Sequence, residues 1–517
     1  MKLVILLIFW LSIVCVGRTQ QNLLPLNSFY KDQLFSGKGS AHQTLPSFLP
    51  AVESDIDLLS AINDSAPMYY TFTHILYQKH LIEIKSEDVY LTISPAVNLA
   101  FGKDFGDTSD RSLYQNTRGI HVEGDFFNNF SFSTSFYENQ SRFMRYETDY
   151  YSSIGENYVQ FDSTYATQNA VIPGAGRTKP FKTDGFDYAY ATGYFVYAPT
   201  KNLHIIAGNN PQFIGVGHRS LLLSDNSFNA PYLRLDWKFA PKWKFHYYRS
   251  RLLNLLRRPF GSSAENFYEQ KGYSSNYITF NPSKKIALSL FEGSVWNRGD
   301  SIVSRTSHPL YYNPVPIVSG LALKGQDEVV SLLGINTHFS VNERHLIYGQ
   351  LAVNDYNFEK IAFQLGYRGY NYFGLNDFMI QLEYNYVPSG MYRNENPRLN
   401  YAHYNLPLAH AKGAGFQEFI LRANYEINHW FADLNAVVYL TENHVKNEHL
   451  SLYTLSPVST TTIVYNRLEL GYRFNRKMNL AIFGQWTFRS ESQTSSPAVN
   501  AITVGIRTSL TNHYTDF

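Results

Sequence analysis

Apolar and polar residues alternate along most of this chain, and the alternation is plainest at residues 232–249. The apolar positions of its first half are Leu233, Leu235, Trp237 and Phe239, and the positions between them are Arg234, Asp236 and Lys238. A period of two places successive side chains on opposite faces of a β-strand. After a break at 240–242 the alternation resumes through Trp243, Phe245 and Tyr247. The stretch therefore predicts a β-hairpin with one apolar and one polar face.

Such hairpins recur, joined alternately by short polar turns and by long segments. The short turns lie at 128–129, 198–202, 240–242, 281–285, 340–345, 370–377, 428–429 and 475–477, and long segments at 139–186, 251–272, 293–330, 388–415 and 441–461. Outer-membrane barrels have short periplasmic turns and long extracellular loops. If both termini are periplasmic, these turns imply about 18 strands. The pattern predicts an all-β fold, a transmembrane antiparallel β-barrel.

Composition agrees with a barrel and leaves one other class open. The chain contains 40 Tyr and 37 Phe, which suit the aromatic girdles of membrane barrels. After residue 20 no apolar run reaches the ~18 residues of a membrane-spanning helix, so a membrane location requires a closed barrel. The alternative is a large secreted β-sandwich or propeller, which also tolerates many aromatic residues. The 44 basic and 42 acidic residues nearly balance, so nucleic acid is not an expected partner.

Two strands carry specific predictions. One outward apolar face is predicted from Tyr188, Tyr190, Tyr194 and Val196. The last strand is predicted over 501–517, with Ile502, Val504, Ile506 and Leu510 in one register and Phe517 at its end. A terminal Phe on an amphipathic strand resembles the signal by which bacterial outer-membrane proteins are presented for assembly.

The N-terminal part divides into a targeting segment and a leader to the barrel. Residues 1–20, MKLVILLIFWLSIVCVGRTQ, join one Lys to an apolar run and predict a cleaved signal peptide. Cys15 is the only cysteine, and no small residue precedes it as lipidation would require, so the mature chain has neither a disulfide nor a cysteine-based metal site. Residues 21–87 predict a short irregular and helical periplasmic segment, or a disordered leader, and residues 88–517 the barrel. The expected location is the outer membrane.

The segment 206–232 departs from the hairpin pattern and is the candidate site. Gly215 and Gly217 lack the strand–turn–helix context of a dinucleotide loop. A His218–Ser220 pair would suit an esterase only with a third orienting group, and residues two apart on a strand do not touch. Polar recognition of a sugar or lipid head group is the third hypothesis, and its residues are His218, Arg219, Asp225 and Asn226.

The alternative for this segment is a structured loop that folds into the lumen. The run 221–223 is Leu-Leu-Leu, which is unfavourable in water, and Arg219 and Asp225 can pair with a charged wall. We expect the loop to fold inward and block the lumen.

This same segment carries a family resemblance. AGNNPQFIGVGHRSLLLSDNSFNAPYLRLDW (207–237) and NTRGIHVEG (116–124) resemble stretches of the Wzi-type capsule-assembly barrels and of the RemB-like gliding-motility proteins of Bacteroidetes. The resemblance implies an 18-stranded outer-membrane barrel with a helical periplasmic N-terminal part. It also implies a non-catalytic role in surface-polysaccharide attachment, or in gliding and adhesion.

The leading prediction is therefore a non-enzymatic barrel for capsule or exopolysaccharide assembly or attachment, or for gliding motility and adhesion. A general diffusion porin is the alternative, from a lumen of mixed charge formed by Arg234, Asp236, Arg368, Glu383, Arg422 and Glu469. An outer-membrane hydrolase is more distant. No metal or cofactor is expected. The expected partners are outer-membrane lipid, surface polysaccharide and other gliding or envelope proteins, and the expected state is a monomer.

Overall fold

A computed structural model describes residues 21–36, 44–56, 58, 62, 70–109, 111–127, 129–159, 165–257, 268–299, 307–326, 328–444, 457–494, 496–508 and 511–517. One sheet dominates it. The barrel strands are β3 (Val89–Asp104), β4 (Ser112–Phe126), β5 (Phe130–Arg142), β11 (Gly185–Thr200), β12 (Leu203–Gly208), β14 (Tyr232–Ala240), β15 (Trp243–Arg257), β16 (Tyr268–Ser283), β17 (Ile286–Gly299), β18 (Val329–Ser340), β19 (His345–Asn354), β20 (Ile361–Tyr370), β21 (Phe378–Val387), β24 (Phe416–Ile427), β25 (Trp430–His444), β26 (Pro457–Asn475), β27 (Leu480–Glu491) and β28 (Val499–Thr508).

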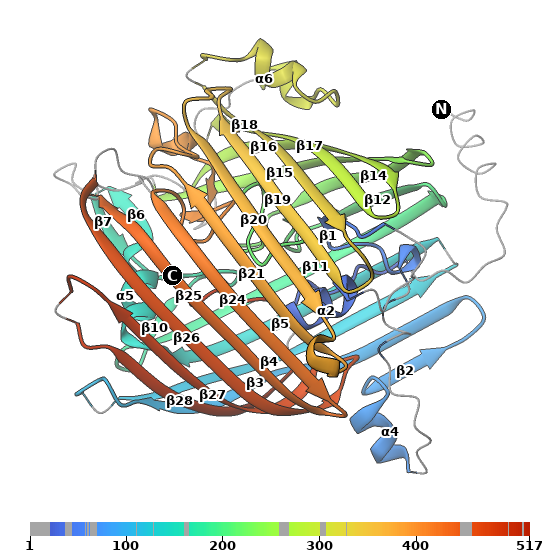
Figure 1. The fold of residues 1–517 in the computed structure, drawn as a ribbon, viewed down its shortest axis with the longest axis vertical. Coiled ribbons are helices and arrows are strands. Elements are labelled where there is room, and N and C mark those ends of the chain that lie inside the picture. Colours follow the sequence, from blue (N-terminus) through green and yellow to red (C-terminus); the bar gives the residue numbers. More distant parts are fainter. Residues whose placement is uncertain are drawn as a thin grey trace.

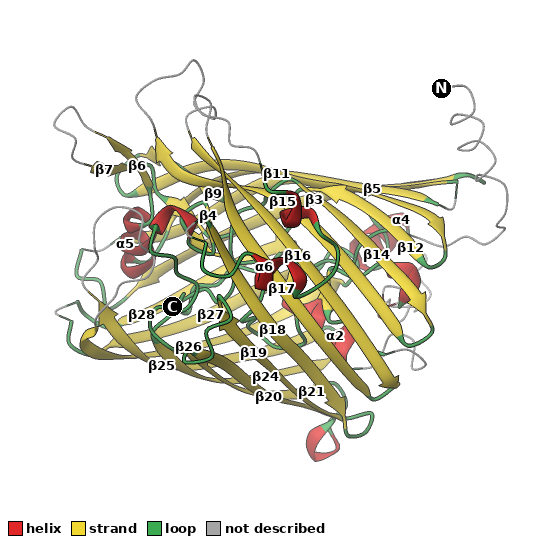
Figure 2. Cartoon of the chain, turned by 90° about the horizontal axis from the view of Figure 1, so that it is seen from above, coloured by secondary structure: helices red, strands yellow, loops and turns green. Residues whose placement is uncertain are grey.

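These strands form a closed ring. Each pairs antiparallel with the next, and β28 returns to β3 with Ile506 opposite Leu99. Closure leaves no edge with unpaired backbone groups, which a strand protein in a membrane requires. Figures 1 and 2 show the ring from two directions. The predicted 18-stranded antiparallel barrel is confirmed.

The two ends of the barrel differ as the sequence predicted. Short connections join β4 to β5, β11 to β12, β14 to β15, β16 to β17, β18 to β19, β20 to β21, β24 to β25 and β26 to β27. Most connections at the other end are longer. In the described residues two of them contain α-helices, namely α5 (Arg145–Ser153) and α6 (Val318–Ala322), the latter preceded by the short helix η2 (Pro309–Tyr312). We call the two ends the turn end and the loop end.

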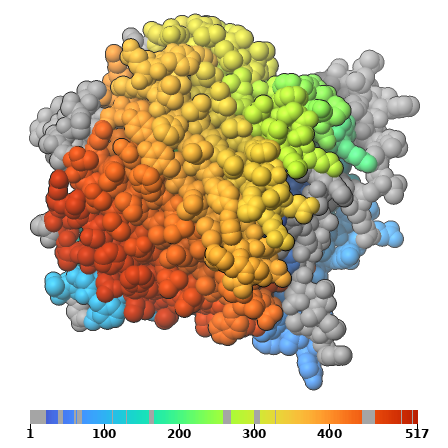
Figure 3. Space-filling model, viewed as in Figure 1, coloured from blue at the N-terminus to red at the C-terminus, as the bar shows by residue number. Residues whose placement is uncertain are grey.

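The predicted division of faces is confirmed on the hairpin of β14 and β15. Trp237 is 50% exposed on the outside, whereas Arg234 and Asp236 are buried on the inside at 0% and 1%. Exposed apolar residues recur outside around the ring, for example Phe101, Leu365 and Leu470. The outer wall between β19 and β28 forms one continuous surface (Figure 3).

On β11 the predicted faces are reversed. Tyr190, Tyr194 and Val196 are buried inside the barrel, and Phe195 is 57% exposed outside. Both faces of this strand carry aromatic residues, so its alternation fits either orientation. Contacts in the lumen decide it, because the Tyr194 hydroxyl accepts a hydrogen bond from the Leu23 backbone N–H.

Segments from four parts of the chain fill the lumen, and we call them together the plug. They are residues 21–36 and 44–56 with α2 (Ser28–Phe35), β1 (Phe48–Leu49) and η1 (Glu53–Asp55); residues 209–231 with β13 (Phe213–Ile214); residues 388–415 with η4 (Pro397–Leu399), β22 (Ala402–His403) and β23 (Leu406–Pro407); and residues 511–517. β1 pairs with β13, and buried apolar residues of the plug and of the inner wall pack together in shared cores.

The first part of the N-terminal segment lies in the lumen and not outside the barrel. We predicted a periplasmic position for residues 21–87, but α2 lies within the ring of strands (Figure 1). Its Asp32 carboxylate pairs with Arg368 of β20 and Arg422 of β24. Only the later part lies at the turn end. There β2 (Ile82–Lys85) pairs with β3, and the Asn475 amide donates to the carbonyls of Ile75 and Lys79 at the C-terminal end of α4 (Thr71–Tyr77). The predicted signal peptide lies outside the described residues.

The C-terminus also differs from the predicted strand. β28 ends at Thr508, and residues 511–517 turn into the lumen, where Tyr514, Asp516 and Phe517 are 7%, 4% and 6% exposed. The sequence NHYTDF is too polar for a lipid-facing strand end, and its polar groups find partners inside the barrel. In the described part of the chain no helix is both long and apolar enough to cross a membrane.

Candidate functional site

The candidate loop, residues 209–231, enters the lumen after β12. Leu221, Leu222 and Leu223 are 0%, 0% and 4% exposed, so the predicted inward fold is confirmed. Gly215 permits the bend: its φ is +116°, and a Cβ there would meet the Gln350 amide nitrogen at 2.4 Å. The loop is fixed to the N-terminal part of the plug by the hydrogen bond from Gly215 N to the Ser47 carbonyl.

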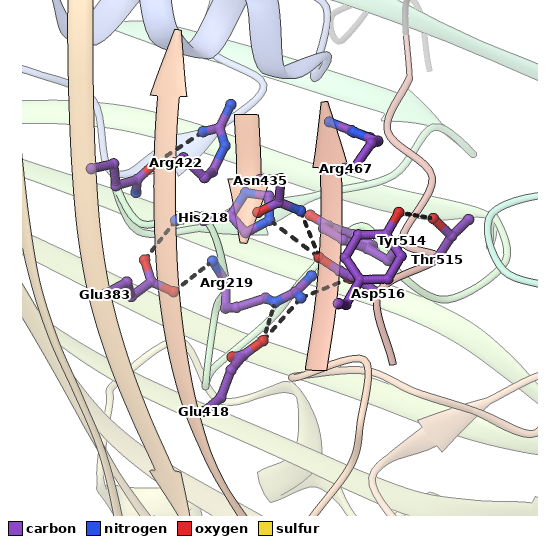
Figure 4. A network of polar contacts seen from close by, with 12 residues as sticks. His218, Arg219, Glu383, Glu418, Arg422, Asn435, Arg467, Tyr514, Thr515 and Asp516 are labelled. Atoms are coloured by element: carbon purple, nitrogen blue, oxygen red, sulfur yellow. Dashed lines mark hydrogen bonds and ion pairs between the residues drawn. The ribbon is translucent and has the colours of Figure 1, made fainter. Parts of the chain in front are cut away.

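Arg219 lies at the centre of a buried ion-pair network (Figure 4). Its Nε and Nη2 donate to Glu418 Oε1 at 3.0 and 2.9 Å, and Nη2 lies 2.8 Å from Asp516 Oδ1. Burial alone would lower the pKa of the guanidinium and raise that of Asp516. The attraction between them prevails, so the pKa of Arg219 lies well above and that of Asp516 well below its usual range. Both are therefore charged at neutral pH.

Glu418 joins three parts of the protein. It belongs to the wall strand β24, it accepts from Arg219 of the 209–231 loop, and its Oε2 lies 2.7 Å from the His410 ring in the 388–415 loop. Asp516 adds the C-terminal segment through Arg219 and through the Asn435 amide at 3.0 Å. One arginine and two carboxylates thus tie three plug segments to the wall.

His218 is held in the network mainly by a hydrogen bond of its backbone. Its N–H donates to Glu383 Oε2 at 2.7 Å, and the Arg219 N–H donates to the other oxygen at 3.0 Å. The ring lies 3.9 Å from Asp516, and burial lowers the pKa of His218 to about 3. The ring is therefore neutral at pH 7. Ser220 Oγ accepts from the N–H groups of residues 222 and 223, an arrangement that stabilises a turn and leaves the esterase hypothesis without support.

The other two predicted residues hold the 209–231 loop to two other plug segments, the C-terminal segment and the 388–415 loop. Asp225 accepts from the Tyr514 hydroxyl at 2.6 Å and from the Asn512 amide at 3.0 Å. The Asn226 amide donates to the Pro407 carbonyl at 3.4 Å. The structure places all four predicted residues inside the lumen with protein partners. Their role in binding a ligand stays a prediction.

Sequence reasoning missed the acidic partners. Glu383 was assigned to the lumen wall, but Asp32, Glu418 and Asp516 were not singled out. Asp32 was placed in the leader and Asp516 at a strand end, so neither was expected near an arginine. The available signal was a carboxylate among aromatic residues, as in the stretch 28–35, SFYKDQLF, because a charge that is buried with apolar residues needs a partner.

A polar cavity of about 260 Å³ remains between the plug and one side of the wall. Wall residues of β3, β4 and β25 to β28 line it, together with α2 and the C-terminal segment; they include Asn98, Gln115, Asp433, Arg467 and Arg507. Two ion pairs lie in this lining, Arg467 with Asp433 at 2.9 Å and Arg507 with Glu469 at 2.5 Å. The lining suits water or a small polar solute. Among the described residues, no group of three or more His, Cys, Asp or Glu could hold a metal ion.

Fold and lumen together define a class: a closed 18-stranded β-barrel filled by segments of its own chain. No family model and no curated protein matches the sequence. Among solved structures the chain resembles Wzi of Escherichia coli, an outer-membrane protein involved in group 1 capsule assembly and described as a carbohydrate-binding β-barrel. The TM-score is 0.55 at 13% identity, over 94% of this chain and 99% of that one.

The chain also resembles porin-type barrels at a lower level. Pseudomonas aeruginosa OprD matches with a TM-score of 0.42 and 8% identity over 83% of this chain and 97% of that one. Acinetobacter baumannii OccAB2 matches with 0.41 and 9% over 80% and 96%. At these identities the likeness concerns the fold.

Proposed function

We propose that this chain is a non-enzymatic outer-membrane β-barrel that acts in the assembly or attachment of a surface polysaccharide. The observation that carries the proposal is the plug. Segments from both ends and the middle of the chain occupy the lumen and are fixed by buried ion pairs at Arg219 and Asp32. A barrel filled in this way suits a scaffold at the cell surface better than an open diffusion pore.

The polysaccharide part of the proposal rests on the fold likeness to the carbohydrate-binding barrel and on the resemblance of residues 207–237, and is an analogy. Attachment through a gliding or adhesion apparatus is the other form of the same surface role. The outer-membrane location is supported by the apolar outer face, with residues such as Leu365 at 61% exposure. Cleavage after the first 20 residues and a monomeric state belong to the same proposal.

A second candidate is a narrow porin. The polar cavity beside the plug, with its paired charges, is the observation that favours it. Conductance of the purified protein in planar bilayers separates the two candidates, because a scaffold should be almost silent and a porin should show a steady open pore.

The polysaccharide role needs its own test. We expect a deletion strain to lose surface polysaccharide on capsule staining while its growth on small solutes is unchanged. Purified barrel should bind the extracted polysaccharide of the same strain, whereas a soluble dextran serves as the control. A deletion strain that keeps its capsule but loses surface movement on film would favour the gliding form. A silent barrel that binds no glycan and leaves both properties intact would contradict the proposal.

A further inference from the structure

The outer face of β15 to β17 carries polar residues toward the loop end. Tyr248, Tyr277 and Phe291 face the lumen core, so the residues next to them point outward. On β16 and β17 these include Asn276 and Glu292, which lie opposite each other. By contrast, Phe419 and Leu421 occupy the comparable part of β24 and are 48% and 39% exposed.

Residues 307–326, which we call the outer flap, cover this polar patch. Glu292 is only 2% exposed because its carboxylate accepts from the backbone N–H groups of Ile317 and Gly320 at 2.9 and 2.7 Å, and from the Tyr356 hydroxyl at 3.0 Å. The Asn313 carbonyl accepts from Arg249 at 3.1 Å and from Asn276 at 3.0 Å. The flap, together with Tyr356 of the β19–β20 connection, supplies partners to the outward polar residues.

Apolar packing holds the flap against the wall as well. Trp296 and Val329 of the wall form a separate core with Tyr311 and Leu323 of the flap, and the Trp296 and Tyr311 rings stack at 4.5 Å. Gly320 sits so close to the β19–β20 connection that a Cβ there would collide with the Tyr356 hydroxyl. Figure 1 shows α6 outside the ring near β16 and β18, and Figure 3 shows this yellow segment at the top of the outer surface.

The middle of the flap exposes apolar side chains away from the wall, whereas the exposed polar residues His308, Lys324 and Gln326 lie near its two ends. Val315, Val318 and Leu321 are 53%, 46% and 56% exposed. They continue the apolar outer face formed on the same strands by Leu288 and Ile335, each 47% exposed. In water such an edge is unfavourable, and in lipid an uncovered Glu292 would be unfavourable. If the flap replaces the wall as the lipid-facing surface, its apolar side chains are kept from water and Glu292 is kept from lipid.

We propose that the outer flap lies in the membrane, with Val318 and Leu321 in contact with acyl chains of the outer leaflet. A connection at the loop end would ordinarily stand in water; here it serves as a lateral cover for a polar patch. The inference rests on the proposed outer-membrane location. Lipid is the occupant because the apolar edge is continuous with the apolar face of the barrel.

Site-directed spin labelling tests this directly, because Cys15 lies within the predicted signal peptide and is the only cysteine of the chain. Single cysteines replace Val318 or Leu321 in the otherwise cysteine-free mature protein in phosphatidylcholine vesicles. Leu365→Cys is the lipid-facing control and Thr108→Cys, exposed in the β3–β4 connection, is the water-facing control. The measurement is the ratio of collision rates with oxygen and with a water-soluble nickel chelate.

We expect the ratios at 318 and 321 to match that at 365, where oxygen is favoured. Ratios that match position 108 while 365 remains in lipid would overturn the inference and leave the proposed location intact. A nickel-accessible label at 365 would instead contradict the location itself, and the inference with it. Immobilised labels at 318 and 321 that neither reagent reaches would indicate a protein partner and also overturn the inference.

A matched pair of variants tests the docking of the flap. Glu292→Gln removes the charge that accepts from the flap backbone, and Glu343→Gln makes the same change in an exposed turn between β18 and β19. With the label at 321, we expect Glu292→Gln to raise nickel accessibility by roughly two-fold or more, since charge-assisted hydrogen bonds are lost. Glu343→Gln should leave it unchanged. Equal values for the two variants would contradict the role of Glu292.

Discussion

Replacing Arg219 by Gln should release the C-terminal segment from the lumen. Gln keeps much of the length of the side chain but not its charge, so Glu418 and Asp516 lose the cation that they share. Both carboxylates contact the same Nη2 atom, at 2.9 and 2.8 Å, and would face each other in a buried site. The substitution therefore removes the attraction of Arg219 to each carboxylate and leaves the two carboxylates to repel each other.

These distances allow an estimate of how much Arg219→Gln destabilises the docked C-terminal segment. Two like charges roughly 5 Å apart repel by about 3 kcal/mol at an effective dielectric constant of about 20. Breaking a buried ion pair by removing one partner costs about 3–5 kcal/mol. Protonation of one carboxylate limits the loss, because raising a pKa from about 4 to 7 costs about 4 kcal/mol. We therefore expect Arg219→Gln to destabilise the docked C-terminal segment by about 4 kcal/mol, which is roughly a 10³-fold rise in the population with this segment released.

Trimming by a carboxypeptidase measures this population. Phe517 is 6% exposed and packs on Tyr150 at 4.1 Å, so cleavage requires release. When release and return are fast, the cleavage rate follows the released population. Arg249→Gln is the control, because Arg249 is a half-buried arginine that also makes hydrogen bonds but contacts the outer flap. A rise of less than about ten-fold for Arg219→Gln, or an equal rise for Arg249→Gln, would refute the reasoning.

A double-mutant cycle isolates the pair itself. Asp516→Asn alone should accelerate trimming by less than Arg219→Gln, because Glu418 still pairs with Arg219. Added to Arg219→Gln, the same change should slow trimming, because it removes the repulsion. We expect a coupling energy of about 1–3 kcal/mol. A coupling near zero would mean that the two side chains act independently.

Three further predictions concern the plug. Deleting residues 215–228 should open an ion-conducting pore and lower the temperature at which the barrel unfolds in detergent; a deletion protein that conducts no more than the intact one would show that this loop does not block the lumen. Deleting residues 511–517 should still give a heat-modifiable barrel, because β28 pairs with β3 through residues 501–507 without them, and failure to assemble would restore the signal role of Phe517. Acid should open the plug: burial lowers the pKa of His218 to about 3, so below its ordinary value of 6.5 only the released state binds the proton. The docked state should then lose about 1.4 kcal/mol per pH unit, measured as open probability in bilayers between pH 6.5 and 5, and His218→Asn should flatten this slope.

The strand alternation was enough to predict the barrel. Period two separates Trp237 from Asp236 whatever lies around them, and the lengths of the connections separate the two ends. These are local properties, because each depends on residues a few positions apart. The inward fold of the 206–232 segment could also be predicted, since a Leu-Leu-Leu run beside charges is unfavourable in water.

The partners inside the barrel were decided by the tertiary structure alone. Arg219, Glu418 and Asp516 meet only because closure brings β24 around to the loop after β12 and the chain returns inward after β28. Asp32 reaches Arg368 and Arg422 across more than three hundred residues of sequence. A contact between residues so far apart in the chain cannot be predicted from the periodicity of the sequence or from the spacing of its residues.

The orientation of β11 and the position of the outer flap also depend on contacts with distant segments, so the sequence did not predict them. On β11 both faces are aromatic, so only the plug contact of Tyr194 selects which face turns inward. Residues 307–326 give no sign in sequence that they cover Glu292. Local chemistry determined which segments become strands; burial against distant segments determined which polar groups face inward, which connections fold onto the wall, and where the C-terminus lies.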